Sequence, residues 1–283
     1  MKLNDSSFEF QENAVVAFPD TTRLAGYRAA LGLWSYLDAS SNNSISHKIS
    51  IATFECKPEE VIESQQQFAE DSAQGISTSG QDQPTGISVV FASAQAAEPR
   101  ITFCFVNGLP EQKRVPEFVD SLIGLLERNG VKRVVTAAAA NVAGVKDSDG
   151  QLWAHLPQRS VGGQLAQSLS DVQRLPAGGV DTNDVFLSAF SNLVEVSSIA
   201  EVGVLLHGDK RPSGSTNRQR STFGGGNCAD DSDGRVVGAL SEALAAAFGC
   251  APGDAVSAGA LDTEVSRIRL DIESAAKGLS AFS

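Results

Sequence analysis

The 283-residue chain is predicted to fold as a single three-layer α/β domain with a mostly parallel central sheet. Apolar, strand-like runs alternate with segments of helical periodicity along most of the sequence. Hydrophobic residues make up 42% of the chain, which is sufficient for a large buried core. We find no internal repeat and no clear linker, so we expect one domain over residues 1–278, followed by a short exposed tail over 279–283.

The first strand and helix are predicted near the N-terminus. "AVVAF" (14–18) has the length and composition of a short buried strand. Apolar residues then recur at three- and four-residue spacing from Leu24 to Leu37, as one face of a helix requires. "KISIATFEC" (48–56) is rich in β-branched and apolar residues and predicts a second strand, and a polar helix is expected between residues 58 and 72.

Two apolar runs, "ISVVFASA" (87–94) and "RITFCFVNGL" (100–109), predict the next strands. The second run is almost entirely apolar, which is typical of a central strand that is covered on both faces. A helix is predicted to begin near Pro116 and to end at Asn129-Gly130. "VKRVVTAAAA" (131–140) follows as a strand, and the order strand, helix, strand predicts a parallel crossover unit.

The pattern recurs in the second half of the chain. A helix capped by a residue within 181–183 precedes the strand-like run "IAEVGVLLHG" (199–208). The segment that follows is polar and glycine-rich, so we expect residues 210–230 to be mobile. Two final helices are predicted over 235–248, ended by a glycine, and over 263–277.

Composition excludes several classes of function. A formal net charge of -12 and an isoelectric point near 4.7 argue against binding to nucleic acid or to an anionic membrane. No apolar stretch approaches eighteen residues, and we expect no secretory signal. The four cysteines are far apart and form no CxxC motif, so we expect neither a metal nor a disulfide framework, and no cofactor. A reducing compartment follows, which is the cytosol or the nucleus.

An enzymatic alternative depends on two weak patterns. The glycines at 224–226 could let backbone amides approach a phosphate, but they do not complete a known phosphate-binding motif. His207 and Asp209 follow a predicted strand, at the position where an α/β enzyme could hold an acid–base pair. A flexible loop and an ordinary turn explain the same residues. Because no nucleophile motif accompanies them, we expect a protein without catalytic residues, with a nucleoside-phosphorylase-like enzyme as the alternative.

Two stretches resemble the proteasome-assembly chaperone family. They are "RITFCFVNGLPEQKRVPEFVDSLIGLLERNGVKRVVTAAAA" (100–140) and "TNDVFLSAFSNLVEVSSIAEVGVLLHGD" (182–209), which together form about a quarter of the chain. Members of this family share a phosphorylase-like α/β fold without phosphorylase activity. The resemblance implies a chaperone that assists assembly of the α-subunit ring of the 20S proteasome and forms a heterodimer with a related subunit.

The C-terminal residues are similar to the family's hydrophobic–Tyr–any residue ending. The matching positions are Ala281, Phe282 and Ser283. The resemblance implies that the aromatic ring fills a slot between proteasome α-type subunits while the free carboxylate meets a basic side chain. The sequence departs from the pattern twice, because Ala281 offers little apolar area and Phe282 lacks the tyrosine hydroxyl. These three residues are the predicted partner-binding site.

Overall fold

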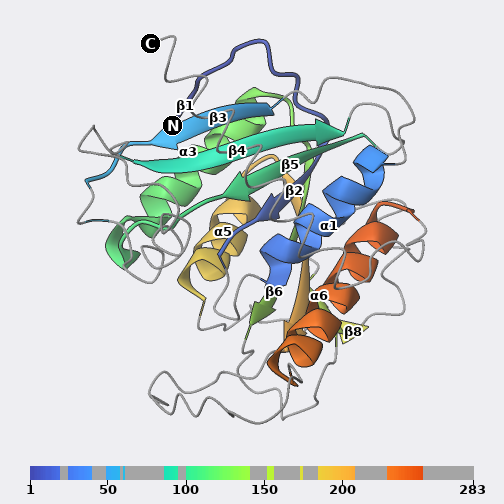
Figure 1. The fold of residues 1–283 in the computed structure, drawn as a ribbon. Helices are drawn as coiled ribbons and strands as arrows, with labels where there is room; N and C mark the ends of the chain where they lie inside the picture. The colour runs from blue at the N-terminus through green and yellow to red at the C-terminus, as the bar shows by residue number, and fades with distance from the viewer. Residues whose placement is uncertain are drawn as a thin grey trace, which may run out of the picture.

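The computed structural model describes residues 1–19, 25–39, 49–57, 60, 86–94, 100–140, 152–155, 173–174, 184–207 and 228–250 (Figure 1). Within these residues, nine strands form one sheet in the order β1-β3-β4-β5-β2-β6-β9-β7-β8. The strands are β1 (Lys2–Leu3), β2 (Asn13–Ala17), β3 (Ile49–Phe54), β4 (Ile87–Ala94), β5 (Ile101–Val106), β6 (Arg133–Ala140), β7 (Leu152–His155), β8 (Gln173–Arg174) and β9 (Ala200–His207). The helices are α1 (Ala25–Ala39), α3 (Val115–Arg128), α5 (Val185–Val196) and α6 (Cys228–Ala247), with a 3-10 turn, η3 (Gln112–Arg114), before α3.

The centre of the sheet is parallel, as the sequence predicts. β5, β2, β6 and β9 are parallel neighbours, and β2 pairs with β5 on one side and with β6 on the other. Both flanks add antiparallel pairs, which the sequence analysis did not assign: β1 with β3, β3 with β4, β4 with β5, and β7 with β9. The fold is therefore an α/β fold with a parallel core, flanked by antiparallel pairs on both sides and by the parallel pair of β7 and β8 at one edge.

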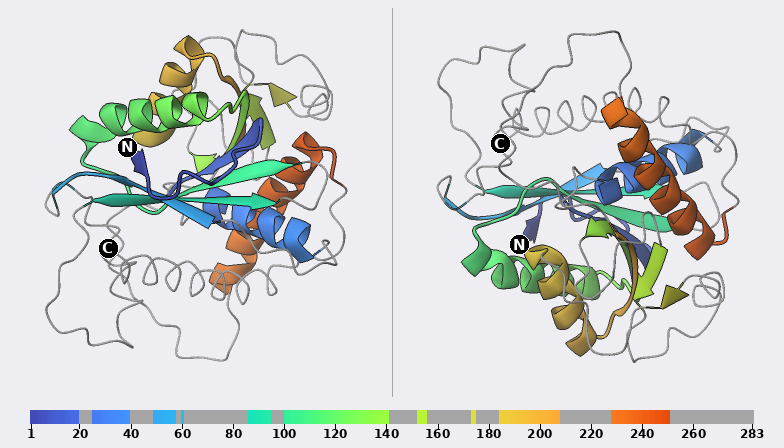
Figure 2. Two further views of the ribbon diagram at one scale, coloured as in Figure 1. Left: turned by 90° about the horizontal axis from the view of Figure 1, so that it is seen from above. Right: turned by 90° about the horizontal axis from the view of Figure 1, so that it is seen from below.

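Helices cover both faces of the sheet and make three layers. Figure 2 shows α3 and α5 on one face and α1 and α6 on the other. Alternate residues of β5 contribute to the two cores: Phe103 and Phe105 pack on the α1 and α6 side, while Cys104 and Val106 pack on the α3 and α5 side. All six residues of this strand are buried, which confirms the prediction of a central strand covered on both faces.

Glycine permits a close approach between α1 and the sheet. A Cβ atom added to Gly26 would lie 1.8 Å from the backbone oxygen of Ala137 in β6. No side chain fits at that distance, so the first turn of α1 rests directly on the backbone of β6. The residues are 111 positions apart, so the local sequence gives no sign of this contact.

Several predicted helix boundaries agree with the structure. α3 carries a proline in its first turn, and Gly130 follows it with a φ of 82°, as expected for a residue that ends a helix. Gly249 ends α6 in the same way, with a φ of 71°.

Other predicted boundaries are wrong. The cap of α5 is Asp184, not a residue within 181–183, and its carboxylate oxygen Oδ1 accepts a hydrogen bond of 2.9 Å from the backbone nitrogen of Leu187. α6 begins at Cys228 rather than at Arg235, so the last three residues of the predicted mobile segment 210–230 are helical. Residues 230–233, whose composition favoured a loop, lie in the first turns of this helix.

Other sequence predictions fall outside the described residues. These are the helix over 263–277, all but Glu60 of the helix over 58–72, the rest of the segment 210–230, and the domain boundary at residue 278. They stay predictions. Among the helices that the structure describes, none combines the length and apolarity that a bilayer span requires.

Candidate functional site

The carboxyl ends of the parallel strands are the place where an α/β protein commonly binds a ligand. Here α1 and the strand ends are joined by neutral side chains. The hydroxyl of Tyr27 in α1 donates a 2.8 Å hydrogen bond to Oδ1 of Asn107, the residue after β5. Nδ2 of Asn107 lies 3.4 Å from the Ser88 hydroxyl in β4, and its backbone nitrogen donates to the Ser88 carbonyl oxygen at 3.0 Å. This network links α1, the end of β5 and β4.

One residue of the enzymatic alternative, His207, lies at the carboxyl end of a strand. His207 is the last residue of β9 and pairs with Ala140 of β6. Its side chain, Asp209 and the glycines at 224–226 lie outside the described residues, as does the predicted tail site, Ala281, Phe282 and Ser283. Within the described part of the chain, no group of three or more His, Cys, Asp or Glu residues could hold a metal ion.

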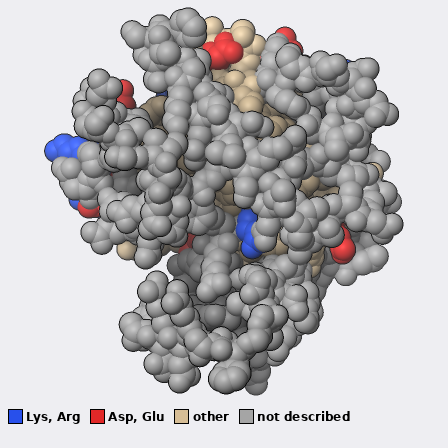
Figure 3. Space-filling view, in the orientation of Figure 1, with Lys and Arg blue, Asp and Glu red and all other residues tan. Residues whose placement is uncertain are grey.

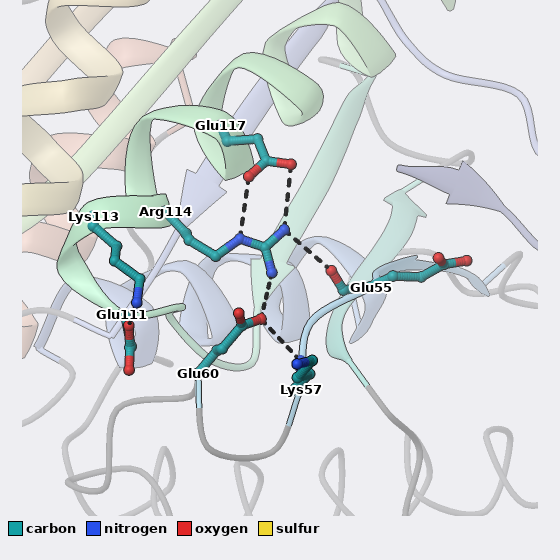
Figure 4. Close-up of polar contacts among 7 residues, drawn as sticks. All are labelled: Glu55, Lys57, Glu60, Glu111, Lys113, Arg114 and Glu117. Atoms are coloured by element: carbon teal, nitrogen blue, oxygen red, sulfur yellow. Dashed lines mark hydrogen bonds and ion pairs between the residues drawn. The ribbon is translucent and has the colours of Figure 1, made fainter.

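A second polar cluster surrounds Arg114, between the end of β3 and the start of α3 (Figure 4). Nε and Nη2 of Arg114 contact the two carboxylate oxygens of Glu117 at 3.1 and 3.3 Å. Nη1 lies 2.5 Å from Oε2 of Glu60, and the guanidinium carbon lies 5.0 Å from the centre of the Phe54 ring. Glu60 also accepts a 3.0 Å bond from the backbone nitrogen of Lys57. Arg114 therefore ties the chain after β3 to the N-terminus of α3.

The pKa shifts in this cluster follow from its hydrogen bonds. The carboxylate of Glu117, and then that of Glu60, raise the pKa of Arg114. The backbone nitrogen of Lys57 and the Arg114 guanidinium lower the pKa of Glu60. Arg114 and Glu60 therefore stay charged near neutral pH. The contacts of Arg114 and Glu60 are made with other residues of the same chain, which indicates that this cluster holds two segments together.

A buried carboxyl group lies between the sheet and α5. Glu201 of β9 is 1% exposed, and its Oε1 accepts hydrogen bonds from the hydroxyl of Thr136 in β6 at 3.1 Å and from that of Ser191 in α5 at 3.2 Å. Its Oε2 has no hydrogen-bond partner among the described residues. Desolvation raises the pKa of Glu201 from 4.5 to about 7, against the opposing effect of the two hydroxyls. This carboxyl group is therefore partly protonated at neutral pH.

A groove lies on the outer side of α3 and α5. It is a hollow of about 390 Å³, and we call it the α3–α5 groove. Val196, at the end of α5, is 78% exposed in this groove, which is unusual for a large apolar side chain beside other apolar groups. Residues that line the groove include Met1, Asp120, Gly124, Arg128, Leu193 and Val196.

One wall of the groove is fixed by a hydrogen-bonded carboxylate. Oε1 of Glu127 in α3 accepts bonds from the backbone nitrogen of Ser198 at 2.7 Å and from its hydroxyl at 2.8 Å. These bonds, the backbone one first, lower the pKa of Glu127, so the contact persists at neutral pH. The α5–β9 turn is thereby joined to the C-terminal end of α3, and the groove has a defined shape.

The described charges do not gather into one basic or acidic face in the view of Figure 3. Described Lys, Arg, Asp and Glu side chains appear there singly or in small mixed groups. Sequence reasoning had located neither the Arg114 cluster, nor Glu201, nor the α3–α5 groove. A signal existed for Glu201, since it is a lone carboxylate within an otherwise apolar strand. The groove depends on two helices that are distant in sequence.

No protein-family model matches the chain, and no curated protein matches its sequence. Solved structures do resemble it. A protein of unknown function from Thermoplasma acidophilum is 12% identical, with a TM-score of 0.51, and the match covers 96% of this chain and 91% of that one. PbaA from Pyrococcus furiosus, an archaeal homolog of proteasome-assembly chaperone, is 16% identical, with a TM-score of 0.49 over 99% of both chains. A purine nucleoside phosphorylase from Toxoplasma gondii is 10% identical, with a TM-score of 0.41 over 85% of this chain and 91% of that enzyme.

The similarity to the Thermoplasma protein supports the α/β fold along nearly the whole chain, and at 12% identity it supports the fold alone.

Proposed function

We propose that this protein is a non-enzymatic chaperone that assists assembly of the α-subunit ring of the 20S proteasome. The observation that carries the proposal is the sequence resemblance over residues 100–140 and 182–209. In the structure, the described parts of these two stretches belong to the same sheet and to the helix layer on one of its faces, with β2 between β5 and β6. β5, α3 and β6 come from the first stretch and α5 and β9 from the second, with α3 packed beside α5 and β6 paired with β9.

The proposed partners are a related chaperone subunit, with which the protein forms a heterodimer, and proteasome α-type subunits. The proposed docking element is the tail Ala281-Phe282-Ser283. Its aromatic ring would fill an apolar slot between two α-type subunits, and its carboxylate would pair with a basic side chain there. The proposed location is the cytosol or the nucleus, because the four cysteines form no disulfide framework. The chaperone and the proteasome subunits that it assembles would have to be in the same compartment.

Three changes in the tail should have different effects on docking. Phe282→Ala removes a ring whose burial contributes about 1.5–3 kcal/mol, so binding to α-type subunits should weaken by about one to two orders of magnitude. Phe282→Tyr should bind as well as the natural sequence or better, because the hydroxyl can form a further hydrogen bond. One residue added after Ser283 moves the carboxylate and should weaken binding although the ring is unchanged. Calorimetric titration of purified α-type subunits measures all three.

The melting temperature of the isolated protein is the control for these variants. It should stay close to that of the natural sequence, because the proposal places the tail in a partner's slot. If Phe282→Ala destabilises the isolated protein by more than about 2 kcal/mol, the ring belongs to the protein's own core. Docking through Phe282 would then be wrong.

A further inference from the structure

We propose that the α3–α5 groove is a surface for self-association, in which α3 packs antiparallel against α3 of a second copy of this chain. The crossing point is Gly124. This inference involves neither the C-terminal tail nor a related subunit, so it does not depend on the proposed function.

The charges on the outer face of α3 are complementary to themselves. Asp120, Gly124 and Arg128 are spaced four residues apart, so they lie along one face of the helix. Both charged residues are exposed and line the groove. A two-fold axis through Gly124 places Asp120 of each copy opposite Arg128 of the other, which is the reciprocal pairing that a symmetric interface requires. Parallel packing of the same two helices would instead oppose Asp120 to Asp120 and Arg128 to Arg128.

Neither charged group is held in an ion pair among the described residues. No salt bridge joins Asp120 or Arg128 to another residue in the part of the chain that the structure describes. By contrast, the exposed charges of Lys113 and Lys132 are each paired with a glutamate. Within the described residues, the charges of Asp120 and Arg128 are therefore not engaged in a salt bridge and remain exposed.

The residue in the middle of this face is a glycine, at the point where a second helix would have to approach closely. Gly124 lies inside α3, where glycine lowers helix stability relative to alanine. A Cβ atom at this position would meet only the end of the Arg128 side chain, at 3.2 Å, so the packing of the single chain does not require a glycine. A glycine at the crossing point lets two helix backbones come closer than larger residues allow.

Apolar groups flank the crossing point on the side of α5. Val196 is 78% exposed, and Leu193 and Met1 line the same groove. A second α3 laid across the groove would cover part of this apolar area. A contact of one helix with another is smaller than a standard interface of about 1,600 Å², so we expect a weak dimer that dissociates on dilution.

A charge exchange tests the reciprocal pairing. Asp120→Arg places two arginines opposite each other at both ends of the crossing, and Arg128→Asp places two aspartates there. Each variant alone should self-associate at least about tenfold more weakly than the natural protein, measured by sedimentation over micromolar to millimolar concentration. An equimolar mixture of the two variants restores both opposite-charge pairs, so the mixture should form a heterodimer about as stable as the natural dimer. Formation of this heterodimer also shows that both variants are folded.

Two further variants separate packing from charge. Gly124→Gln should raise or preserve the melting temperature, because glutamine favours helix more than glycine does, and it should abolish self-association by blocking the approach of α3. Glu9→Arg makes the same change of charge at an exposed position outside the groove and should leave self-association unchanged. The proposal is overturned if the natural protein stays monomeric at millimolar concentration. It is also overturned if the single charge variants associate like the natural protein, or if their mixture does not associate.

Discussion

Gly26→Ala should destabilise the protein by more than about 3 kcal/mol, because the added methyl group has no room. Its Cβ atom would lie 1.8 Å from the carbonyl oxygen and 2.6 Å from the carbonyl carbon of Ala137. Both are backbone atoms in the middle of the sheet, so no side-chain rotation can relieve the contact. α1 would have to move away from β6 and would lose packing against the core. Urea denaturation gives the free energy of unfolding directly, and the melting temperature should fall by at least about 6 °C.

Gly238→Ala in α6 is the matched control. It makes the same substitution in another helix, at a position where a Cβ atom meets nothing within 4 Å. Because alanine favours helix over glycine, this variant should be more stable than the natural protein by about 0.5–1 kcal/mol. If Gly26→Ala lowers the free energy of unfolding and Gly238→Ala raises it, the results support the close approach of α1 to β6. A Gly26→Ala protein as stable as the natural one would show that α1 does not rest on the backbone of β6.

Glu201→Gln should make the protein more stable above pH 7 and should remove part of its dependence on pH. Burial raises the pKa of Glu201 from 4.5 to about 7 in the folded state. The folded state therefore binds a proton that the unfolded state has released between these two values, and stability falls as the pH rises through this window. The contribution of the raised pKa of Glu201 to the free energy of unfolding is fully present below pH 4.5 and is lost above pH 7. The difference corresponds to on the order of 3 kcal/mol.

Glutamine has the shape of the protonated carboxyl group and keeps an acceptor for the hydroxyls of Thr136 and Ser191. The free energy of unfolding of Glu201→Gln should thus exceed that of the natural protein at pH 8 and should approach it at pH 5. Urea denaturation at a series of pH values measures the difference, and Glu9→Gln, at an exposed position, should follow the natural protein throughout. If Glu201→Gln is less stable than the natural protein at pH 8, the charged carboxylate is stabilised by the fold and the assignment of a raised pKa is wrong.

The elements that the sequence predicted well are those with a strong local signal. β5 is an unbroken apolar run, and its burial on both faces follows from that run alone. α3 has a proline in its first turn and Gly130 after its end, which are signals that depend on backbone geometry at single positions. Such features were confirmed because they need no knowledge of which elements become neighbours.

The features that the sequence did not predict depend on neighbours distant in sequence. The antiparallel direction of the edge strands is not encoded in their composition. Gly26 has its role only because Ala137 lies beneath it, and the α3–α5 groove exists only where two helices pack side by side. The early start of α6 was missed for a different reason, because the polar and acidic composition of its first turns is also common in loops.

The proposal of a proteasome-assembly chaperone is tested most directly by reconstitution with purified proteasome α-type subunits from the same organism. Native mass spectrometry would follow the subunits over time, with and without this protein and its related subunit. The proposal predicts complexes that contain this protein together with α-type subunits but no β-type subunits, and a faster appearance of complete α rings. The absence of any such complex, together with an unchanged rate of ring formation, would contradict it.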